Sequence, residues 1–453
     1  VPQLILEKNL FGLDIDERAA QLTGFALMMK GRADDRQLFE RGVKLNVMAV
    51  VDSTGFDAEG LAKGVELSDY DLRPGDLTEL KRLFEHATTF GSLILVPEGL
   101  ASRLPALKRL SEVTSQDLFV SETLKRLGPL VRQAELLAAQ YDAVVANPPY
   151  MGSKYQTPRV KSFAKEQYPD AKGDLFACFI ERGGYTLAKT DGRSALVTMQ
   201  SWMFLASFRR LREQVLREKT ITTMAQIGYN SFPSLNSKVA QATVFSMRAS
   251  RVRGFRGTYW DLNSAPQSAN KDEVFLARDP ANRFSVSTED FEKIPGLPLA
   301  YWASRHAASL FEGTLLGEVT RSEGAVKTGD NDRYIRFHWE VNSSAVASDG
   351  HWRKHPRGGE YRKWYGNVIE VLDWHAETRQ HYRSDHVARI PDERYWDLEG
   401  ICWSEITSAH PSFRTLVADE MANNKSLTIY PNNPSDRGAV LGFLNTSLAR
   451  ALL

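Results

Sequence analysis

The sequence has 453 residues, of which 42% are hydrophobic and 25% charged, with 57 Lys and Arg against 56 Asp and Glu. This length predicts two or three domains. No apolar run approaches the roughly 20 residues that span a bilayer, which argues against a membrane protein. The two cysteines, Cys178 and Cys402, lie far apart, so the sequence excludes a disulfide scaffold and a zinc ribbon and predicts a cytoplasmic location.

Strand-like and helix-like segments alternate over about the first 250 residues. Short apolar runs predict strands at residues 10–15, 93–96, 141–146, 194–198 and 240–247. Amphipathic spacing predicts helices at residues 17–30, 121–140, 175–188 and 207–218, the first of them capped by Asp16. This alternation predicts an α/β fold with a doubly wound sheet and crossover helices.

The texture of the sequence changes after this region. Residues 261–282 are rich in Ser, Asn, Asp and Pro, which is typical of a linker, and the segments beyond are shorter and richer in aromatic and basic residues. We therefore predict a first domain over residues 1–260, a linker or helical connection over 261–310, and an α+β domain over 311–453.

Basic residues are unevenly distributed. Residues 151–260 carry 18 Lys and Arg against 7 Asp and Glu, and residues 351–365 interleave cations with aromatic rings. Phosphate neutralisation combined with base stacking needs this mixture, although a solvated basic face is an equally good interpretation of either block. The cations that we expect to contact nucleic acid are Arg209, Arg210, Arg212, Arg217, Lys219, Arg251, Arg253, Arg256, Arg353, Lys354, Arg362 and Lys363.

The motif that carries chemistry is Asn147-Pro148-Pro149-Tyr150, which directly follows the predicted strand 141–146. Ligands of open α/β sheets bind at the carboxyl ends of the strands. The two prolines fix the turn and leave their carbonyls free to accept hydrogen bonds. The Asn147 side-chain oxygen and the Pro148 carbonyl could hold both hydrogens of an amino group, while Tyr150 stacks on a planar ring. Positioning and electrostatics would then activate the amine without a metal. A plain proline-rich turn is the alternative.

This motif resembles that of S-adenosylmethionine-dependent amino-group methyltransferases, chiefly N6-adenine DNA methyltransferases. Segments NPPYMGS (147–153), GDLFA (173–177), QSWMFL (200–205), FPSLNSK (232–238) and TGDNDR (328–333) resemble the PglX-type adenine-specific enzymes of bacterial BREX phage defence. The resemblance covers most of the chain. It implies a Rossmann-like methyltransferase domain followed by a partial DNA target-recognition domain, with double-stranded DNA and other BREX proteins as partners.

The resemblance also implies roles for individual residues. Asp14 would bind the ribose hydroxyls of S-adenosylmethionine, Ser92 would lie near its adenine, and Asp174 would flank the methyl-donor pocket or simply cap a helix. Phe232 would be a second aromatic residue against the flipped base, or a core residue. Asn331 and Arg333 would contact DNA.

The chain departs from the family pattern at its start. It begins at Val1, not at methionine, and only thirteen residues precede Asp14, without the Gly-rich loop that wraps the methionine end of the cofactor. We therefore expect an internal piece of a longer polypeptide that by itself binds S-adenosylmethionine poorly and is inactive.

Two other functions remain open from the sequence. An enzyme with the same tetrapeptide could methylate glutamine side chains of proteins or RNA bases, although the large aromatic and basic C-terminal region argues against this. The chain could instead be a non-catalytic DNA-recognition subunit of a defence complex. Cytosine-N4 enzymes usually have Ser or Asp where Asn147 stands, and we find no nuclease cluster in the sequence.

Overall fold

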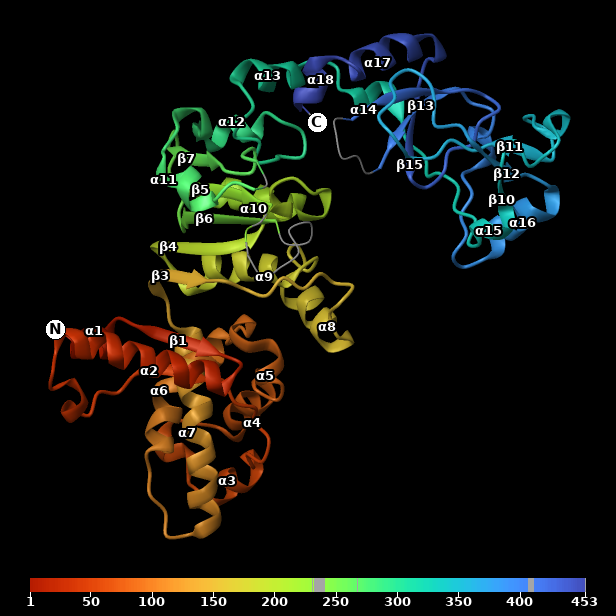
Figure 1. Cartoon of the computed structure of the whole chain (residues 1–453). Coiled ribbons are helices and arrows are strands. Elements are labelled where there is room, and N and C mark those ends of the chain that lie inside the picture. Colours follow the sequence, from red (N-terminus) through yellow and green to blue (C-terminus); the bar gives the residue numbers. More distant parts are fainter. Residues whose placement is uncertain (230, 232–240, 267, 406–410, 453) are drawn as a thin grey trace. The chain divides into compact units, whose positions relative to one another are not determined.

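The computed structural model describes residues 1–229, 231, 241–266, 268–405 and 411–452. It divides into two compact units, Val1–Trp302 and Ala303–Leu453 (Figure 1). In the described part of the chain, no helix is long and apolar enough to cross a membrane.

The first unit begins with a parallel strand pair. β1 (Phe11–Asp14) pairs with β2 (Asn46–Ala49), and α2 (Glu17–Asp34) connects them after the short α1 (Pro2–Lys8). The helix α2 starts where expected because the Asp16 carboxylate accepts a hydrogen bond from the Arg18 amide at 2.7 Å.

A helical layer follows in the chain. Its apolar faces pack together, and Leu61, Leu77, Leu107 and Leu127 are fully buried in its core. Figure 1 shows this layer in orange, below the six-stranded sheet that follows it in the chain. Its helices are α3 (Ala58–Gly64), α4 (Pro74–Leu83), α5 (Ala87–Phe90), α6 (Glu98–Ser111) and α7 (Leu118–Ala138).

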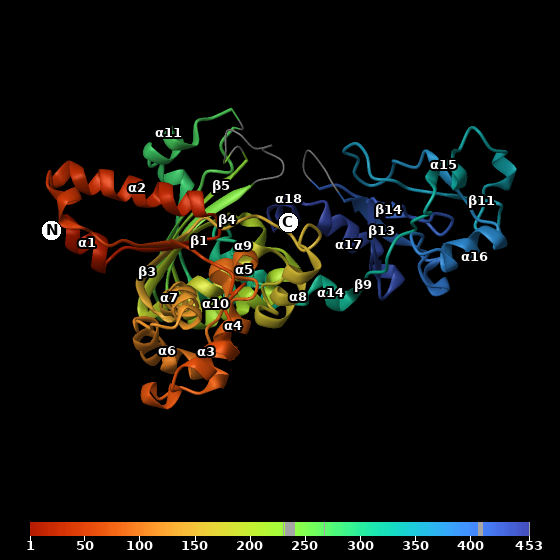
Figure 2. The same ribbon diagram turned by 90° about the horizontal axis from the view of Figure 1, so that it is seen from below.

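A six-stranded mixed sheet forms the rest of the first unit. Its order is β3-β4-β6-β5-β7-β8, with parallel pairs β3–β4 and β5–β7 and antiparallel pairs elsewhere. The strands are β3 (Tyr141–Ala146), β4 (Ala188–Met199), β5 (Thr220–Gly228), β6 (Ala242–Arg248), β7 (Arg256–Asp261) and β8 (Arg283–Ser287). The helices of this region are α8 (Pro158–Gln167), α9 (Leu175–Glu181), α10 (Arg209–Glu218), α11 (Lys271–Leu276) and α12 (Thr288–Glu292). The unit is therefore a mixed α/β fold, and Figure 2 shows the same elements from below.

Two segments differ from the sequence expectation. Residues 93–96, expected as a strand, follow the 3₁₀ turn Gly91–Leu93 without joining a sheet. Leu93 and Ile94 are buried, but their backbone carbonyls accept hydrogen bonds from the side chains of Tyr168 and Arg182 and not from a neighbouring strand. Residues 261–302, expected within the connection 261–310, belong to the first compact unit, because β8 pairs with β7 and Phe291 and Tyr301 join the core under the sheet.

The second unit contains two small antiparallel sheets, with strand orders β10-β12-β11 and β14-β13-β15-β9. Leu372 and Trp374 are buried in the core beside the first sheet. The strands are β9 (Thr320–Arg321), β10 (Ile335–Phe337), β11 (Trp352–Lys354), β12 (Glu370–Asp373), β13 (Gly400–Ser404), β14 (Phe413–Leu416) and β15 (Ser426–Pro431). The helices are α13 (Arg305–Ser309), α14 (Leu316–Val319), α15 (Asn331–Tyr334), α16 (Ala376–Ser384), α17 (Arg437–Leu444) and α18 (Ser447–Leu452).

Candidate active site at the strand ends

The Asn-Pro-Pro-Tyr segment leaves the carboxyl end of β3, as the sequence predicted. Asn147 and Pro149 are exposed, Pro148 is buried and Tyr150 is half-buried. The Tyr150 ring meets Phe176 edge-on, with centroids 6.2 Å apart and an interplanar angle of 89°. Burial raises the pKa of Tyr150 to about 12, so its phenol is neutral at physiological pH. The segment thus combines an exposed amide with a fixed aromatic ring.

Asp174 fixes the chain just after this motif. Its Oδ1 accepts hydrogen bonds from the Met151 amide at 2.8 Å and from the Phe176 amide at 3.3 Å, the latter capping α9. The Leu175 amide also donates to the Met151 carbonyl at 3.2 Å. Burial raises the pKa of the Asp174 carboxyl. The two interpretations of Asp174 are therefore compatible, because its role as a helix cap also anchors the residue that follows Tyr150.

Asp14 is exposed at the carboxyl end of β1. Its Oδ1 accepts from the Asp16 amide at 2.9 Å, which leaves lone pairs on the carboxylate for further donors. The rings of Phe11 and Tyr141, the first residues of β1 and β3, have centroids 5.2 Å apart. The arrows of β1 and β3 run the same way in Figure 1, and Asp14 ends the first strand while Asn147 follows the second.

A cavity of about 560 Å³ lies near the opposite, amino ends of these strands. Phe11 and Tyr141 line it, together with the charged side chains of Lys108, Arg132 and Lys189. Neither the Asn-Pro-Pro-Tyr segment nor Asp14 is among the residues that line it. The candidate site is therefore separate from this cavity.

Ser92 lies on a turn that approaches the end of β1. Gly91 has a φ of +56°, and a Cβ built on it would lie 2.8 Å from Ile15 Cγ2, so glycine permits this close approach. The Tyr168 hydroxyl donates to the Leu93 carbonyl at 2.6 Å. The structure therefore brings the turn of Ser92 next to the residue that follows Asp14.

Arg182 is a structural residue that the sequence analysis did not single out. The residue is 2% exposed, and its guanidinium donates to the carbonyls of Ser92 at 2.9 Å, Ile94 at 3.0 Å and Leu137 at 2.8 Å. It thereby supplies hydrogen-bond donors to backbone carbonyls in and beside the segment 93–96, which was expected to be a strand. Its position after a helix and before Gly183 carried no signal for this role.

A buried polar network near the end of β4 was also missed. The Tyr301 hydroxyl donates to Gln226 Oε1 at 2.7 Å, and Gln226 Nε2 donates to Gln200 Oε1 at 2.9 Å. Gln200 opens the QSWMFL segment, which is the only sequence signal that pointed to this region. The network holds the end of β4 to β5.

The basic residues expected at DNA divide into exposed and buried groups. Arg209 and Arg210 are exposed on α10, with Arg209 Nε 2.8 Å from Glu213 and Arg210 3.7 Å from Asp170. Arg212 is 1% exposed and donates to backbone carbonyls, including that of Trp202 at 2.8 Å. The expectation that Arg212 contacts phosphate is therefore wrong, because its donors are used inside the fold.

In the second unit, Arg353 differs from the expectation in the same way. Its side chain is 1% exposed, pairs with Asp397 and lies 5.1 Å over the Trp374 ring. It supports the core in place of facing DNA.

Lys219 is also buried, and its Nζ donates to the Ala249 carbonyl at 2.9 Å, so the expectation that it contacts DNA is wrong. Arg217, Arg253 and Arg256 are exposed. Arg251 pairs with Glu289 and Glu292, each at 3.1 Å.

The remaining residues expected at DNA have these positions. Lys354 pairs with Asp419 at 2.8 Å, and Lys363 Nζ donates to the Asn445 carbonyl at 2.7 Å. Arg362 is exposed. Asn331 and Arg333 are exposed on α15, where Asn331 Oδ1 accepts from Thr328 at 2.6 Å. Phe232 lies outside the described residues.

The Asn-Pro-Pro-Tyr segment directly after β3 is the feature by which the sequence resembles amino-group methyltransferases. The comparisons agree. Residues 8–232 match the family model described as Eco57I restriction-modification methylase. The chain is 35% identical over 440 residues to the adenine-specific methyltransferase BrxX of Escherichia coli O9:H4 (strain HS), an alignment that covers 91% of the chain. It is 32% identical over 477 residues, and over 100% of its length, to the adenine-specific methyltransferase PglX of Lacticaseibacillus casei (strain Zhang). The resemblance inferred from the motifs is thus confirmed.

The chain spans only 36% and 39% of the lengths of these two curated relatives. Among solved structures, the Type IIL restriction-modification enzyme MmeI in complex with DNA aligns with 96% of the chain and 51% of its own. Its TM-score is 0.50 at 11% sequence identity, which supports a shared fold.

Proposed function

We propose that this chain forms part of a site-specific DNA methyltransferase that transfers a methyl group from S-adenosylmethionine to N6 of a flipped-out adenine, in bacterial phage defence of the BREX type. The observation that carries the proposal is the Asn-Pro-Pro-Tyr segment at the end of β3, with the amide of Asn147 exposed and the ring of Tyr150 held by its neighbours. The adenine-specific relatives named above support the choice of substrate.

The proposed chemistry uses the exposed amide directly. The Asn147 side-chain oxygen and the Pro148 carbonyl would each accept a hydrogen of the adenine amino group, which localises the nitrogen lone pair. Bound S-adenosylmethionine supplies an electrophilic methyl group on its sulfonium. The nitrogen–carbon bond would form as the sulfur–carbon bond breaks, and the amine proton would pass to water.

The residues at the carboxyl ends of β1 and β3 fit S-adenosylmethionine in their chemistry. The exposed Asp14 carboxylate retains lone pairs for two ribose hydroxyls, which is how acidic residues at strand ends bind ribose. Ser92 lies on the turn beside this end of β1, and Asp174 anchors the backbone after Tyr150. We propose that these three residues flank the cofactor.

We propose further that the sheets of the first unit belong to one doubly wound, Rossmann-like methyltransferase domain. The parallel pairs β1–β2 and β3–β4 support this arrangement, as does the contact between the first residues of β1 and β3. The second unit would be an α+β target-recognition domain for double-stranded DNA, and other BREX proteins would be partners of the whole protein.

Base flipping costs a few kcal/mol, and stacking on Tyr150 would offset about 1–3 kcal/mol of that cost. The exposed guanidiniums of Arg209 and Arg210 are available for phosphates beside the flipped nucleotide. In the second unit, Arg333 and Arg362 are exposed cations for DNA. The proposed DNA-binding surface keeps these four arginines and leaves out the buried Arg212, Lys219 and Arg353.

Base-resolution mapping of methylated adenine tests this proposal. DNA is taken from cells that make the full-length protein with its partners, carrying either the native residue or Asn147→Ala. We expect methylation at one recurring sequence and a loss of about 100-fold or more in the variant, the scale for removing one preorganised polar group from an active site. Gln37→Ala, which removes an exposed amide that makes no side-chain cap, should retain full methylation.

The outcomes separate the alternatives. Equal methylation in Asn147→Ala would remove this residue from the mechanism. If neither protein methylates DNA despite confirmed expression, the adenine-methyltransferase proposal is wrong. Mass spectrometry of glutamine residues and RNA from the same cells would then distinguish another methyl acceptor from a non-catalytic recognition subunit.

A further inference from the structure

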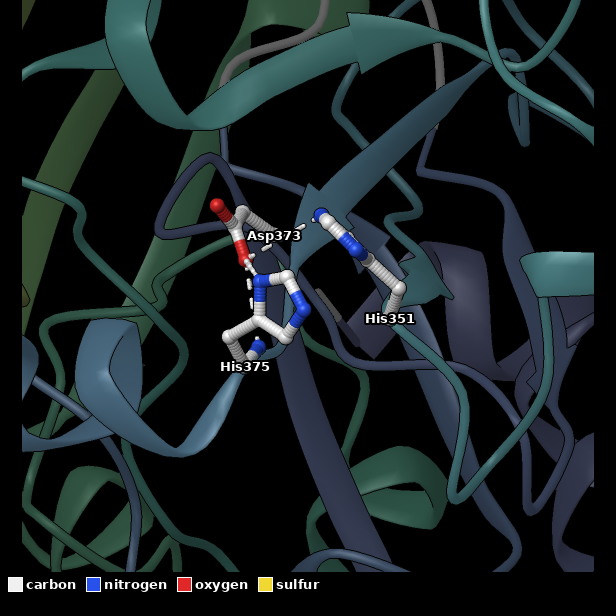
Figure 3. A group of neighbouring side chains, drawn as sticks. All are labelled: His351, Asp373 and His375. Carbon is white, nitrogen blue, oxygen red and sulfur yellow. Dashed lines mark hydrogen bonds and ion pairs between the residues drawn. The ribbon is translucent and has the colours of Figure 1, made fainter.

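Three side chains with metal-binding atoms converge in the second unit: His351, Asp373 and His375 (Figure 3). His351 directly precedes β11, Asp373 ends β12, and His375 is the residue before α16. Their nearest potential ligand atoms all lie within 4.8 Å of one another. The first histidine falls in the stretch expected at DNA, but its partners are more than twenty residues further along the chain, so the sequence alone gave no sign of the cluster.

The backbone explains why these residues meet. β11 and β12 are antiparallel, with Trp352 opposite Asp373, and the Trp374 amide donates to the His351 carbonyl at 2.7 Å. Asp373 and His375 are two residues apart around the buried Trp374. In extended backbone, alternate side chains point to the same face, so burying Trp374 turns both neighbours toward His351.

Further contacts hold the cluster in place. Asp373 Oδ1 accepts from the His375 backbone amide at 3.1 Å, and the Asp373 carbonyl accepts from the Tyr382 hydroxyl at 3.1 Å. The Trp352 ring stacks on His351, with centroids 4.8 Å apart and planes inclined by 18°. Such surrounding contacts keep metal ligands in position before the ion arrives.

The distances fit a small divalent ion. His351 Nε2 lies 3.9 Å and His375 Nδ1 3.5 Å from Asp373 Oδ1. Tetrahedral zinc with bonds of about 2.0–2.1 Å separates its ligand atoms by about 3.4 Å. Both separations from Asp373 are thus within about half an ångström of this value, and all three ligand atoms lie within 4.8 Å of one another. The side chains of His351 and His375 are 38% and 54% exposed, which leaves an entry path from solvent.

We propose that His351, Asp373 and His375 bind a divalent transition-metal ion of the zinc class. Two imidazole nitrogens and one carboxylate oxygen are a donor set that zinc and related first-row ions favour. Three protein ligands leave the fourth position to water. The ion would join the β11–β12 hairpin to the start of α16, and this assignment is independent of the methyltransferase site.

The test uses the whole chain stripped with EDTA and then titrated with ZnCl₂ by calorimetry. We expect one ion per chain, and a visible spectrum of tetrahedral Co²⁺ when CoCl₂ replaces zinc. His351→Ala and His375→Ala should each weaken binding by at least about 100-fold, because loss of even an outer-sphere partner costs 10- to 100-fold. Asp373→Asn keeps an oxygen for the His375 amide but removes the charge, and should also weaken binding.

His386→Ala is the matched control, since this histidine is exposed and lies 4.0 Å from the single carboxylate of Asp385. It should bind zinc like the native chain. Circular dichroism of each metal-free variant checks that the fold is retained. The proposal is overturned if the native chain binds no zinc, or if the two histidine variants bind it as tightly as the control. In that case the two histidines only contact the Asp373 carboxylate and bind no metal.

Discussion

The arginine side chains of this protein have two different roles, structural when they are buried and available to a ligand when they are exposed. Arg182 and Arg212 are almost fully buried and donate to backbone carbonyls from distant segments. Arg210 has 82% of its side chain exposed and lies 3.7 Å from Asp170. A sequence shows the charge of each residue but not which carbonyls would otherwise be left unsatisfied, so the basic block of residues 151–260 could not be divided in advance.

Replacing Arg182 with methionine should be strongly destabilising. The change keeps an unbranched aliphatic stem but removes the guanidinium, which leaves the carbonyls of Ser92, Ile94 and Leu137 without their donor. Hydrogen bonds to a charged group contribute about 1.5–3 kcal/mol each, so we expect a loss of at least about 3 kcal/mol in the free energy of unfolding. Urea denaturation measures this loss. Arg210→Met should change stability by no more than about 0.5 kcal/mol, and an equal effect of both changes would contradict the argument.

Glu181 gives the protein a stability that depends on pH. Burial, with a smaller contribution from the charge of Asp170, raises the pKa of Glu181 from 4.5 to about 7. The folded state therefore holds this proton more tightly than the unfolded state, and its stabilising contribution is full below pH 4.5 and is lost as the pH rises to about 7.

Glu181→Gln mimics the protonated carboxyl at every pH. We expect the variant to gain stability relative to the native protein at pH 8 and to show little difference at pH 4.5. Urea denaturation at the two pH values gives the comparison. A difference that is the same at both pH values would show that the proton on Glu181 is not responsible.

At the scale of elements, local signals predicted those parts whose pattern and packing agree. β1 and β3 were recognised as short apolar runs, and α2 was correctly started at its Asp16 cap. β2 and β5 gave no clear period and were missed. The prediction of a strand at residues 93–96 was wrong because an apolar run indicates burial but not the partner of the backbone. The Leu93 carbonyl bonds to Tyr168 and the Ile94 carbonyl to Arg182, which lie 75 and 88 residues away in the sequence.

The candidate site was predicted only in part, because some of its residues have a local sequence signature and others depend on distant contacts. The Asn147 motif has a local signature, whereas Arg182 and the Gln226 network depend on contacts between distant segments. Asp174 caps α9 as one of its two interpretations predicted, and it also binds the Met151 amide. Its place beside the methyl-donor pocket stays a prediction. The His351 cluster needed the register of β11 against β12, which no local pattern encodes.

The turn at Gly91 brings Ser92 close to the end of β1. Position 91 should therefore not accept a residue with a side chain. Gly91→Ala would place a Cβ 2.8 Å from Ile15 Cγ2 at a φ of +56°. We expect a loss of about 1–3 kcal/mol in unfolding free energy, the range for strained backbone. Gly99→Ala in α6, where the new Cβ meets nothing within 4 Å, should be neutral or stabilising by up to about 1 kcal/mol. Urea denaturation of both variants checks the contrast, and similar stabilities would mean that the turn relaxes.

At the scale of the whole molecule, the two compact units have separate cores. Leu107 is fully buried in the helical layer of the first unit, and Leu372 is fully buried beside the three-stranded sheet of the second. Leu107→Ala and Leu372→Ala should each cost about 2–5 kcal/mol, from lost burial and the cavity left behind. Because chains with separate cores need not unfold as one cooperative unit, we expect two calorimetric transitions. Each variant should lower the melting temperature of its own unit alone. If both variants lowered both transitions equally, the two units would unfold together. A destabilising substitution in the second unit would then also lower the stability of the structure around Asn147.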